Sequence, residues 1–183
     1  MSDAHRKAKT PDQTRRALLD AAAAQAMRHG IAALSLPAVA EAAGLTKGAV
    51  FHHFGSKQGL TEALCAELID RIDAELDAAL AADEGGHGTF TRAYVICTFQ
   101  PQGSASPWSA LSLSALTDPS LARIWSDWMA ARLARHAATD DSPQLQILRL
   151  ATDGFWLASL QGHAPADPQD LCRRLLAATR SFS

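Results

Sequence analysis

The sequence predicts an all-α fold of about nine helices, and three observations support this prediction. Apolar residues recur three and four positions apart over most of the 183-residue chain, which is the spacing of one helix face. Serine, threonine or proline precedes several of these segments and glycine follows others, as expected where helices begin and end. No segment alternates apolar and polar residues as a half-buried strand would. A chain of this length can bury a sizeable core between its helices.

The first two predicted helices have clear ends. Residues 12–28 place apolar side chains on one face, and Gly30 ends this first helix. Ser35 is expected to cap the second helix, because its hydroxyl can accept a hydrogen bond from an exposed backbone N–H. Pro37 fits the first turn of that helix, where a missing N–H does no harm, and Gly44 ends it.

A short third helix follows over residues 47–53, with Thr46 as its expected N-cap. Val50 and Phe54 form its apolar side. Its other side is small and polar and consists of Lys47, Gly48, Ala49, His52 and His53. Two helices joined at a glycine turn, the second with a short polar face, are typical of the helix-turn-helix that places a recognition helix in the major groove of DNA. The alternative is an ordinary helical corner whose polar face meets only water.

The remaining predicted helices are separated by loops rich in glycine, proline and polar residues. Ser56 is expected to cap a long fourth helix that ends near Ala82. The later helices are predicted over residues 89–99, 108–116, 119–138, 144–161 and 170–180. The loops are predicted over residues 83–88, 100–107 and 162–168.

The net charge of −2 hides an uneven distribution along the chain. Residues 1–58 hold eight basic and four acidic side chains, whereas the remainder holds nine basic and fifteen acidic ones. A basic first third on an acidic remainder is expected of a DNA-contacting head joined to a body that does not touch DNA. Small charge differences between segments are common, so the distribution supports the helix-turn-helix only modestly.

Several other classes of protein are not expected from this sequence. No run of about 18 uncharged apolar residues predicts a membrane span, and the polar, basic residues 1–10 do not resemble a signal peptide. Cys65, Cys97 and Cys172 are far apart and lack C-x-x-C spacing, which predicts reduced thiols rather than a disulfide or a zinc site. No nucleophile-elbow, Walker or H-E-x-x-H motif indicates an enzyme. We therefore expect a cytoplasmic protein with no catalytic residue, cofactor or metal.

Three motifs follow one another in the N-terminal third of the chain. Thr-Arg-Arg-Ala-Leu-Leu-Asp-Ala-Ala occupies residues 14–22, His-Gly occupies residues 29–30, and residues 35–57 end in His-Phe-Gly-Ser-Lys. In this order they resemble the tetracycline-repressor (TetR) family of bacterial transcription regulators. The resemblance implies a helix-turn-helix DNA-binding domain over residues 1–55 and a ligand-binding and dimerisation domain over residues 56–183. It also implies a homodimer whose two heads bind successive major grooves of a palindromic operator.

The resemblance and the helix positions together predict the DNA contacts. Lys47 stands at the start of the recognition helix, where it can reach a base edge or a phosphate. Ser35, Thr46 and Lys57 stand at helix N-termini, which suit phosphate oxygens, although plain capping also explains Ser35 and Thr46. The full predicted set is Thr14, Ser35, Thr46, Lys47, Gly48, Ala49, Phe51, His52, His53 and Lys57.

This head departs from the family pattern at three places. Gln25 and Ala26 replace bulkier apolar residues, which implies looser packing. Phe51 stands where the family usually has a tyrosine whose hydroxyl reaches a phosphate, and phenylalanine cannot donate that bond. His53 stands where the family often has tyrosine or histidine, and it is expected to supply the contact instead. Adjacent His52 and His53 point in different directions on a helix, so they are not expected to share a metal.

Aromatic side chains are concentrated beyond the predicted DNA-binding head. The candidates for an effector-binding cleft are Phe99, Trp108, Trp125, Trp128, Phe155 and Trp156. An aromatic cleft suits an apolar or a cationic aromatic small molecule, and ordinary core packing is the alternative for each residue. Asp73, Asp77 and Asp127 would favour a cation if they faced inward, but we expect all three to be solvated.

The last two predicted helices are expected to form the dimer interface, as the family resemblance implies. The candidate interface residues are Leu150, Leu157, Leu160, Leu171 and Leu175. Packing in the core of a single protomer is the alternative for each of them.

The sequence thus predicts a ligand-responsive transcriptional regulator, specifically a repressor that a small effector releases from its operator. Its expected partners are double-stranded operator DNA, the small-molecule effector and a second copy of the chain. Two alternatives stay open. One is a helical small-molecule-binding or interaction protein without operator binding, for which Phe51 is the only support, and the other is an activator built on the same fold.

Overall fold

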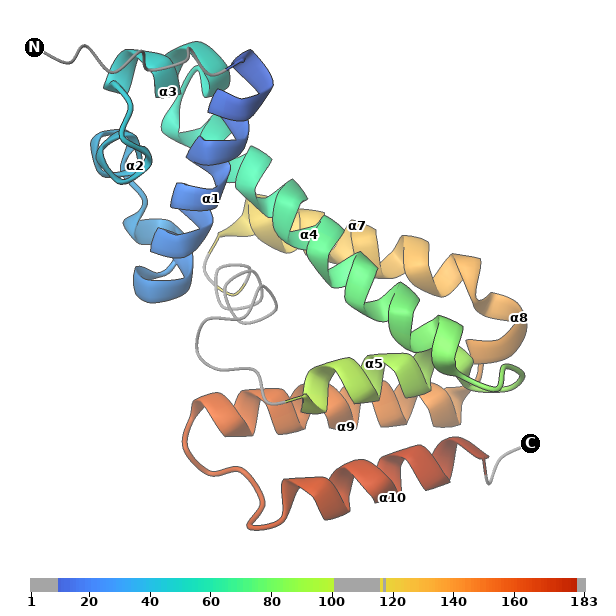
Figure 1. The fold of residues 1–183 in the computed structure, drawn as a ribbon. Coiled ribbons are helices and arrows are strands. Elements are labelled where there is room, and N and C mark those ends of the chain that lie inside the picture. The colour runs from blue at the N-terminus through green and yellow to red at the C-terminus, as the bar shows by residue number, and fades with distance from the viewer. Residues whose placement is uncertain (1–9, 101–115, 117, 181–183) are drawn as a thin grey trace, which may run out of the picture.

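The computed structural model describes residues 10–100, 116 and 118–180, and within these ranges it contains nine α-helices, one 3-10 helix and no strand (Figure 1). The elements are α1 Pro11–His29, η1 Ile31–Ala33, α2 Leu36–Ala43, α3 Lys47–Phe54, α4 Lys57–Ala82, α5 Thr89–Phe99, α7 Pro119–Arg135, α8 Ala137–Asp140, α9 Pro143–Leu160 and α10 Pro168–Arg180. The all-α prediction is confirmed. The helix predicted over residues 108–116 lies, apart from Leu116, outside the described residues.

Side-chain caps begin the helices where the sequence predicts them. Ser35 accepts a hydrogen bond from the backbone N–H of Ala38 at 3.3 Å, and Ser56 accepts one from that of Gly59 at 3.0 Å. Thr10 and Gln13 cap α1 reciprocally, which the sequence analysis did not anticipate. These local bonds satisfy N–H groups that have no partner inside the helix, so they define where each helix starts.

One predicted helix is interrupted. The segment predicted as one helix over residues 119–138 is divided at His136, whose backbone (φ −104°, ψ 14°) is not helical. The short α8 then turns the chain and leads into α9. This turn brings Asp140 to the N-terminus of α5, where it accepts hydrogen bonds from the backbone N–H groups of Phe90 (3.1 Å) and Thr91 (2.8 Å).

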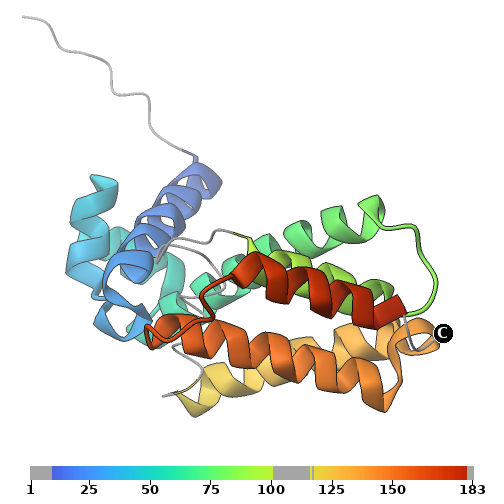
Figure 2. The same ribbon diagram turned by 90° about the horizontal axis from the view of Figure 1, so that it is seen from below.

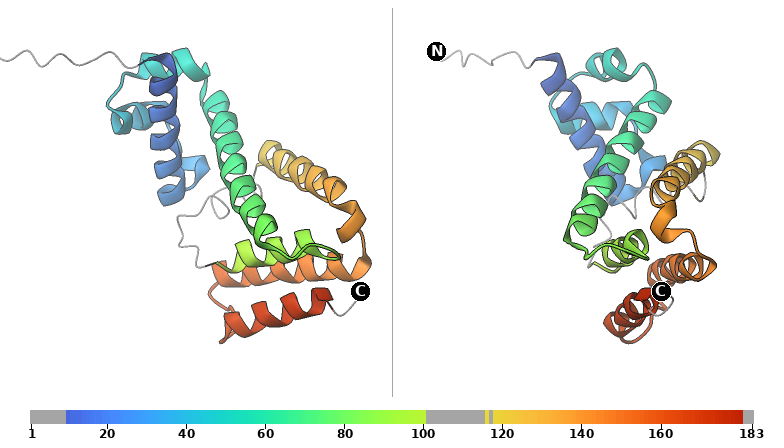
Figure 3. Two further views of the ribbon diagram at one scale, coloured as in Figure 1. Left: turned by 45° about the vertical axis from the view of Figure 1, so that its right-hand side comes forward. Right: turned by 90° about the vertical axis from the view of Figure 1, so that its right-hand side faces the viewer.

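The helices form a small head, a long connecting helix and a helical body. The head consists of α1, α2 and α3, and α4 extends from it into the body (Figures 1 and 3). Helices α5, α9 and α10 pack together at the far end of the body, with α9 and α10 side by side in Figure 2. Helix α7 packs against α4, and α8 joins it to α9. Among the described helices, none combines the length and apolarity that crossing a bilayer requires.

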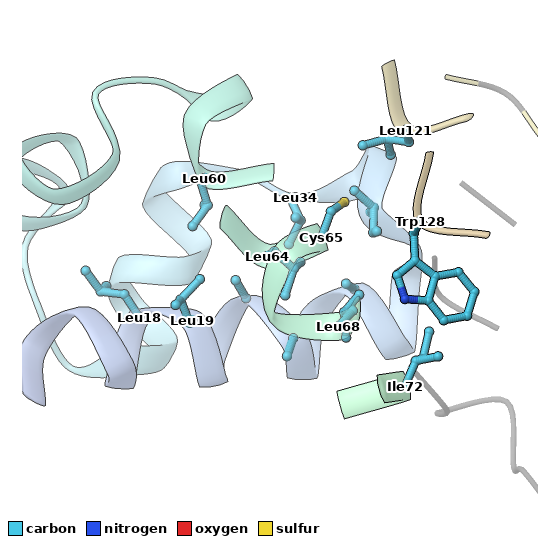
Figure 4. Close-up of a cluster of buried hydrophobic side chains, with 14 of the residues drawn as sticks. Leu18, Leu19, Leu34, Leu60, Leu64, Cys65, Leu68, Ile72, Leu121 and Trp128 are labelled. Carbon is cyan, nitrogen blue, oxygen red and sulfur yellow. The ribbon is translucent and has the colours of Figure 1, made fainter. Parts of the chain in front are cut away.

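Most of the core is one continuous cluster that extends from the head into the body. In the head it contains Leu18 and Val39, and in the body it contains Phe90 and Trp128. Helix α4 joins the two parts through a row of buried side chains, drawn in part in Figure 4: Leu60, Leu64, Cys65, Leu68, Ile72 and Leu76. A second, smaller cluster lies between α5, α9 and α10 and consists of Val95, Phe99, Leu145, Leu148, Cys172 and Leu175. The head therefore has no core separate from α4.

Gly59 allows α3 and α4 to meet closely. A Cβ atom at Gly59 would lie 2.1 Å from the carbonyl oxygen of Phe54, which is backbone and cannot swing aside. Gly59→Ala is therefore expected to push α3 away from α4 and to lower the free energy of unfolding by about 1–3 kcal/mol, measured by urea denaturation. Gly48→Ala is the matched control, because its Cβ would approach only Thr46 Oγ1, at 3.7 Å. Equal stability of Gly59→Ala and wild type would show that the junction is not tightly packed.

Candidate nucleic-acid interface and its connection to the body

The turn between α2 and α3 is built as the sequence analysis predicts. Gly44 adopts the left-handed conformation (φ 65°, ψ 36°) that ends α2, a conformation that glycine adopts without steric cost. Thr46 then starts α3 by accepting a hydrogen bond from the backbone N–H of Ala49 at 3.2 Å. Val39 on α2 and Val50 on α3 are both fully buried in the larger cluster. These contacts fix α3 across α2 in a helix-turn-helix.

The outward side of α3 is exposed and carries no acidic residue. Lys47, Gly48, Phe51 and His52 are exposed, and Ala49 and His53 are partly buried. None of the described ion pairs involves Lys47 or either histidine. The positive charge on this side is thus not compensated by a carboxylate in the described head, as a surface that meets phosphate requires.

The other predicted DNA contacts border α3. Ser35 and Thr14 are partly buried, and Thr46 is exposed, with the Ser35 and Thr46 hydroxyls already engaged in capping. Lys57 is exposed, but its ammonium donates a hydrogen bond to the carbonyl oxygen of Ala32 at 2.8 Å. An ammonium has three donors, so this bond ties α4 to η1 and still leaves capacity for a phosphate.

Arg15 lies beside α3 but is not among the DNA contacts predicted from the sequence. It is exposed on α1, and its guanidinium lies over the ring of Phe54, 5.4 Å from the ring centroid. This cation–π contact holds a positive charge beside the C-terminal end of α3. No local pattern marks Arg15, because the contact depends on how α1 crosses α3.

The aromatic residues predicted to form an effector cleft lie in two separate places. Phe99 and Phe155 stack on each other in the smaller cluster, with ring centroids 3.8 Å apart. Trp125 and Trp128 lie on α7, with centroids 4.9 Å apart. Trp156 is partly buried on α9. The predicted Trp108 lies outside the described residues.

Two of these aromatic side chains are buried by contacts within the protomer. Phe99 is buried against Phe155, and Trp128 is buried with its indole Nε1 donating a hydrogen bond to Asp73 Oδ1 at 2.7 Å. Both side chains therefore pack as core residues, which was the alternative that the sequence left open. Trp125 remains the more accessible of the two tryptophans on α7.

Asp73 and Asp77, predicted to be solvated, are partly exposed, but both also bind a side chain of α7. Arg132 on α7 donates from Nε to Asp73 Oδ1 at 2.8 Å and from Nη1 to Asp77 Oδ1 at 2.7 Å. The hydrogen bond from Arg132 lowers the pKa of Asp77 below its ordinary value. Asp127 is exposed, as predicted. Trp128 and Arg132, like Asp73 and Asp77, are four residues apart, a spacing that places each pair on one helix face and that was visible in the sequence.

The predicted interface residues divide between the surface and the core. Leu150, Leu157 and Leu160 are 61%, 41% and 41% exposed on α9. Leu171 is partly buried, and Leu175 is only 6% exposed within the smaller cluster. Leu175 therefore packs mainly inside its own protomer, which was the alternative that the sequence left open.

The exposed face of α9 contains two further residues that were not predicted from the sequence. Ile147 is 64% exposed, and a Cβ at Gly154 would meet no atom within 4 Å. With Leu150 and Leu157 these residues repeat at intervals of three and four, so they form one line along the helix. We call Ile147, Leu150, Gly154 and Leu157 the α9 stripe. An exposed apolar line of this kind on a globular protein indicates an interaction surface.

Two family models match the chain and together include most of it. The model described as "Bacterial regulatory proteins, tetR family" matches residues 18–64. The model described as "Tetracyclin repressor-like, C-terminal domain" matches residues 88–180. The first match contains the helix-turn-helix, and the second contains α5 and all the later described helices.

Curated proteins similar to the chain are transcriptional regulators by name. The HTH-type transcriptional regulator BetI of Paraburkholderia xenovorans is 27% identical over an alignment of 169 residues that covers 85% of this chain and 86% of that protein. The HTH-type transcriptional regulator AlkX of Mycobacterium tuberculosis is 29% identical over an alignment of 130 residues that covers 67% of this chain and 60% of that protein. The match to AlkX thus spans less than two thirds of that relative.

Solved structures share the whole fold. A transcriptional regulator of Pseudomonas aeruginosa superimposes with a TM-score of 0.72 at 20% identity, covering 100% of this chain and 96% of that chain. A TetR family member of Streptomyces coelicolor has a TM-score of 0.70 at 25% identity, covering 91% and 98%. The multidrug binding protein EbrR complexed with malachite green has a TM-score of 0.70 at 24% identity, covering 90% and 96%.

Proposed function

Because the chain belongs to the TetR family of bacterial transcriptional regulators, we propose that it is a homodimeric repressor that a small molecule releases from a palindromic operator. The observation that supports operator binding best is the exposed, acid-free side of α3, held in place by buried Val39 and Val50. Two such helices in a dimer would enter successive major grooves on one face of the duplex. The protein would act in the cytoplasm, where its DNA lies.

The proposed dimer forms through the α9 stripe. Its side chains are exposed in the protomer, and a second copy would remove them from water. A two-fold dimer uses the same surface on both copies, so the α9 stripe of one protomer can pack against the α9 stripe of the other. The two heads then lie at a spacing set by the path from α9 to α3.

The proposed effector is an apolar or cationic aromatic compound that binds in the body. Support comes from the aromatic side chains of the body, of which Trp125 and Trp156 are not fully buried. In addition, EbrR, which shares the fold, is described as complexed with malachite green. The effector would release DNA only if it binds better to a state whose heads have another spacing.

Lys47→Ala tests operator binding. We expect it to weaken binding by about 1–3 kcal/mol on a duplex selected by the wild-type protein from a random-sequence pool. Lys47 is exposed at the first position of α3, so the loss should come from a missing DNA contact and leave the fold intact. Titration at several salt concentrations measures the change, and adding malachite green to the wild-type complex tests release in the same assay.

The control for Lys47→Ala is Arg173→Ala, which removes an exposed charge on α10, far from the head. A loss confined to one base position assigns Lys47 to base readout, and a uniform loss assigns it to a phosphate. If the wild-type protein itself shows no salt-dependent duplex binding, the proposed repressor function is wrong. The alternative of a helical ligand-binding protein without an operator then gains support.

A further inference from the structure

Helix α7 packs against α4, and its first buried residue belongs to the core cluster that extends into the head. Leu121, near the start of α7, is buried in the same cluster as Cys65 of α4 and Leu34 of the head (Figure 4). Burial, together with the nearby carboxylates of Asp118 and Glu62, raises the pKa of the Cys65 thiol to about 12. Cys65 therefore acts as an apolar packing residue at this junction.

Four side chains form a polar contact further along the same two helices. Asp73 and Asp77 project from α4, and Trp128 and Arg132 project from α7. Asp73 Oδ1 accepts hydrogen bonds from Trp128 Nε1 (2.7 Å) and Arg132 Nε (2.8 Å), and Asp77 Oδ1 accepts one from Arg132 Nη1 (2.7 Å). We call these four residues the α4–α7 clamp.

The clamp fixes how α7 sits on α4 more strictly than apolar contacts do. Apolar burial is non-directional, so leucines alone would let one helix slide or rotate against the other. The guanidinium of Arg132 is planar, and its donors point in fixed directions. Its side chain is 3% exposed, whereas those of Asp73 and Asp77 are 34% and 57% exposed. A shift by one helical turn would therefore leave a covered cation without its carboxylates.

The other end of α7 is bonded to the body through α8. Asp140 on α8 is 1% exposed and accepts hydrogen bonds from two backbone N–H groups at the start of α5. Arg149 on α9 donates to Thr91 Oγ1 at 2.8 Å and to the backbone oxygen of Asp140 at 3.2 Å. A continuous series of contacts thus leads from α9, which carries the apolar stripe, through α8 and α7 to α4 and the head.

We propose that Asp73, Asp77, Trp128 and Arg132 are positioning residues for operator binding, which fix the direction of α4 relative to α9 and thereby the spacing of the two heads. This inference rests on the proposed function. With the clamp intact, the dimer presents its two recognition helices at one separation. Without it, α4 loses these directional hydrogen bonds to α7, and the heads occupy a wider range of separations.

Half-site spacing provides a measurement that a merely structural role would not change. One base pair inserted between half-sites moves them apart by about 3.4 Å and turns them by about a tenth of a helical turn. The experiment measures the affinity of the full-length dimer for its selected operator and for versions with one base pair added or removed at the centre. We define the spacing ratio as the affinity for the selected operator divided by the affinity for a version with altered spacing. A high ratio means that the separation of the two heads is strictly fixed.

Two variants and one control complete the design. Trp128→Phe keeps an aromatic ring and removes the indole N–H. Arg132→Met replaces the covered cation by an apolar side chain of similar length. Asp127→Asn changes an exposed residue beside Trp128 and should behave as wild type. For both clamp variants we expect the spacing ratio to fall by about fivefold or more, while sedimentation still shows a dimer.

The outcomes separate the two proposals. An unchanged spacing ratio in Trp128→Phe and Arg132→Met would overturn the positioning role, even if both variants bind every operator more weakly. If Arg132→Met does not fold, Trp128→Phe decides the question, because it keeps an aromatic ring in the core and leaves Arg132 paired with its carboxylates. A wild-type protein that binds no duplex, or binds all spacings equally, would overturn the proposed dimeric repressor and the positioning role with it.

Discussion

Asp83→Asn is expected to lower the free energy of unfolding by about 3–5 kcal/mol. Arg92 on α5 donates from Nη2 to Asp83 Oδ1 at 2.6 Å and from Nε to Asp83 Oδ2 at 2.8 Å. The two side chains are only 5% and 7% exposed. Removing the carboxylate charge leaves a buried guanidinium with neutral partners only, and a buried charge without its counter-ion is strongly destabilising. Urea denaturation of the two proteins measures the difference.

The pH dependence of this difference has a definite sign. The hydrogen bond from Arg92 lowers the pKa of Asp83 below its ordinary value of 3.8. A carboxyl whose pKa is lowered by folding contributes stability above its unfolded pKa and loses that contribution as the pH falls through its folded pKa. The difference in free energy of unfolding between wild type and Asp83→Asn should therefore have its full size at pH 7 and decrease below a pH of about 4.

The neighbouring residue provides the control for Asp83→Asn. The side chain of Glu84 is 87% exposed and lies 3.8 Å from that of Arg180, also exposed. Glu84→Gln should change stability by less than about 0.5 kcal/mol, because exposed ion pairs contribute little. If Asp83→Asn unfolds at the same urea concentration as Glu84→Gln, the buried pair does not stabilise the junction of α4 and α5.

Leu150→Arg combined with Leu157→Arg is expected to abolish the dimer and to reduce operator affinity by about 10²–10⁴-fold. Both leucines are exposed in the protomer, so arginine is tolerated there in a single chain. In the proposed interface each arginine would be buried without a partner charge. A single head retains only half of the DNA contacts and loses the gain from binding two linked sites. Sedimentation measures the dimer, and duplex titration measures the affinity.

A second double variant controls for the added charge. Ala130→Arg with Ala134→Arg places two arginines on an exposed face of α7 and should leave the dimer intact. Leu175→Arg would not be informative, because Leu175 is buried and the change would disrupt the protomer itself. If Leu150→Arg with Leu157→Arg still sediments as a dimer, the α9 stripe is not the interface.

The parts of the fold that were predictable depend on local chemistry. Ser35, Thr46 and Ser56 cap their helices because a hydroxyl at that position binds an N–H three residues away. The outward side of α3 follows from the same local pattern. Such features need no knowledge of the tertiary fold, so the sequence predicts the helix-turn-helix well.

The parts that were not predictable depend on which helix faces meet. Asp73 and Trp128 are 55 residues apart in sequence, and nothing near either residue specifies the other. Leu157 and Leu175 both lie at apolar positions of their helices, yet one is exposed and the other is core. Helical periodicity identifies an apolar face, but it does not say whether that face meets the same chain or a second copy.

The continuous core limits how regulators of this kind can be recombined. A chimera joined at residue 55 would pair the native Leu18 and Val50 with a foreign α4, since their partners Leu60 and Leu64 lie beyond the joint. A joint placed after Leu68 would transfer these partners together with the head. Asp73 and Asp77 would not be transferred, so their contacts with Trp128 and Arg132 would stay within the body to which they belong. A chimera that exchanges operator specificity between relatives is therefore expected to fold when its joint lies within α4 and to fail when the joint lies at the start of α4.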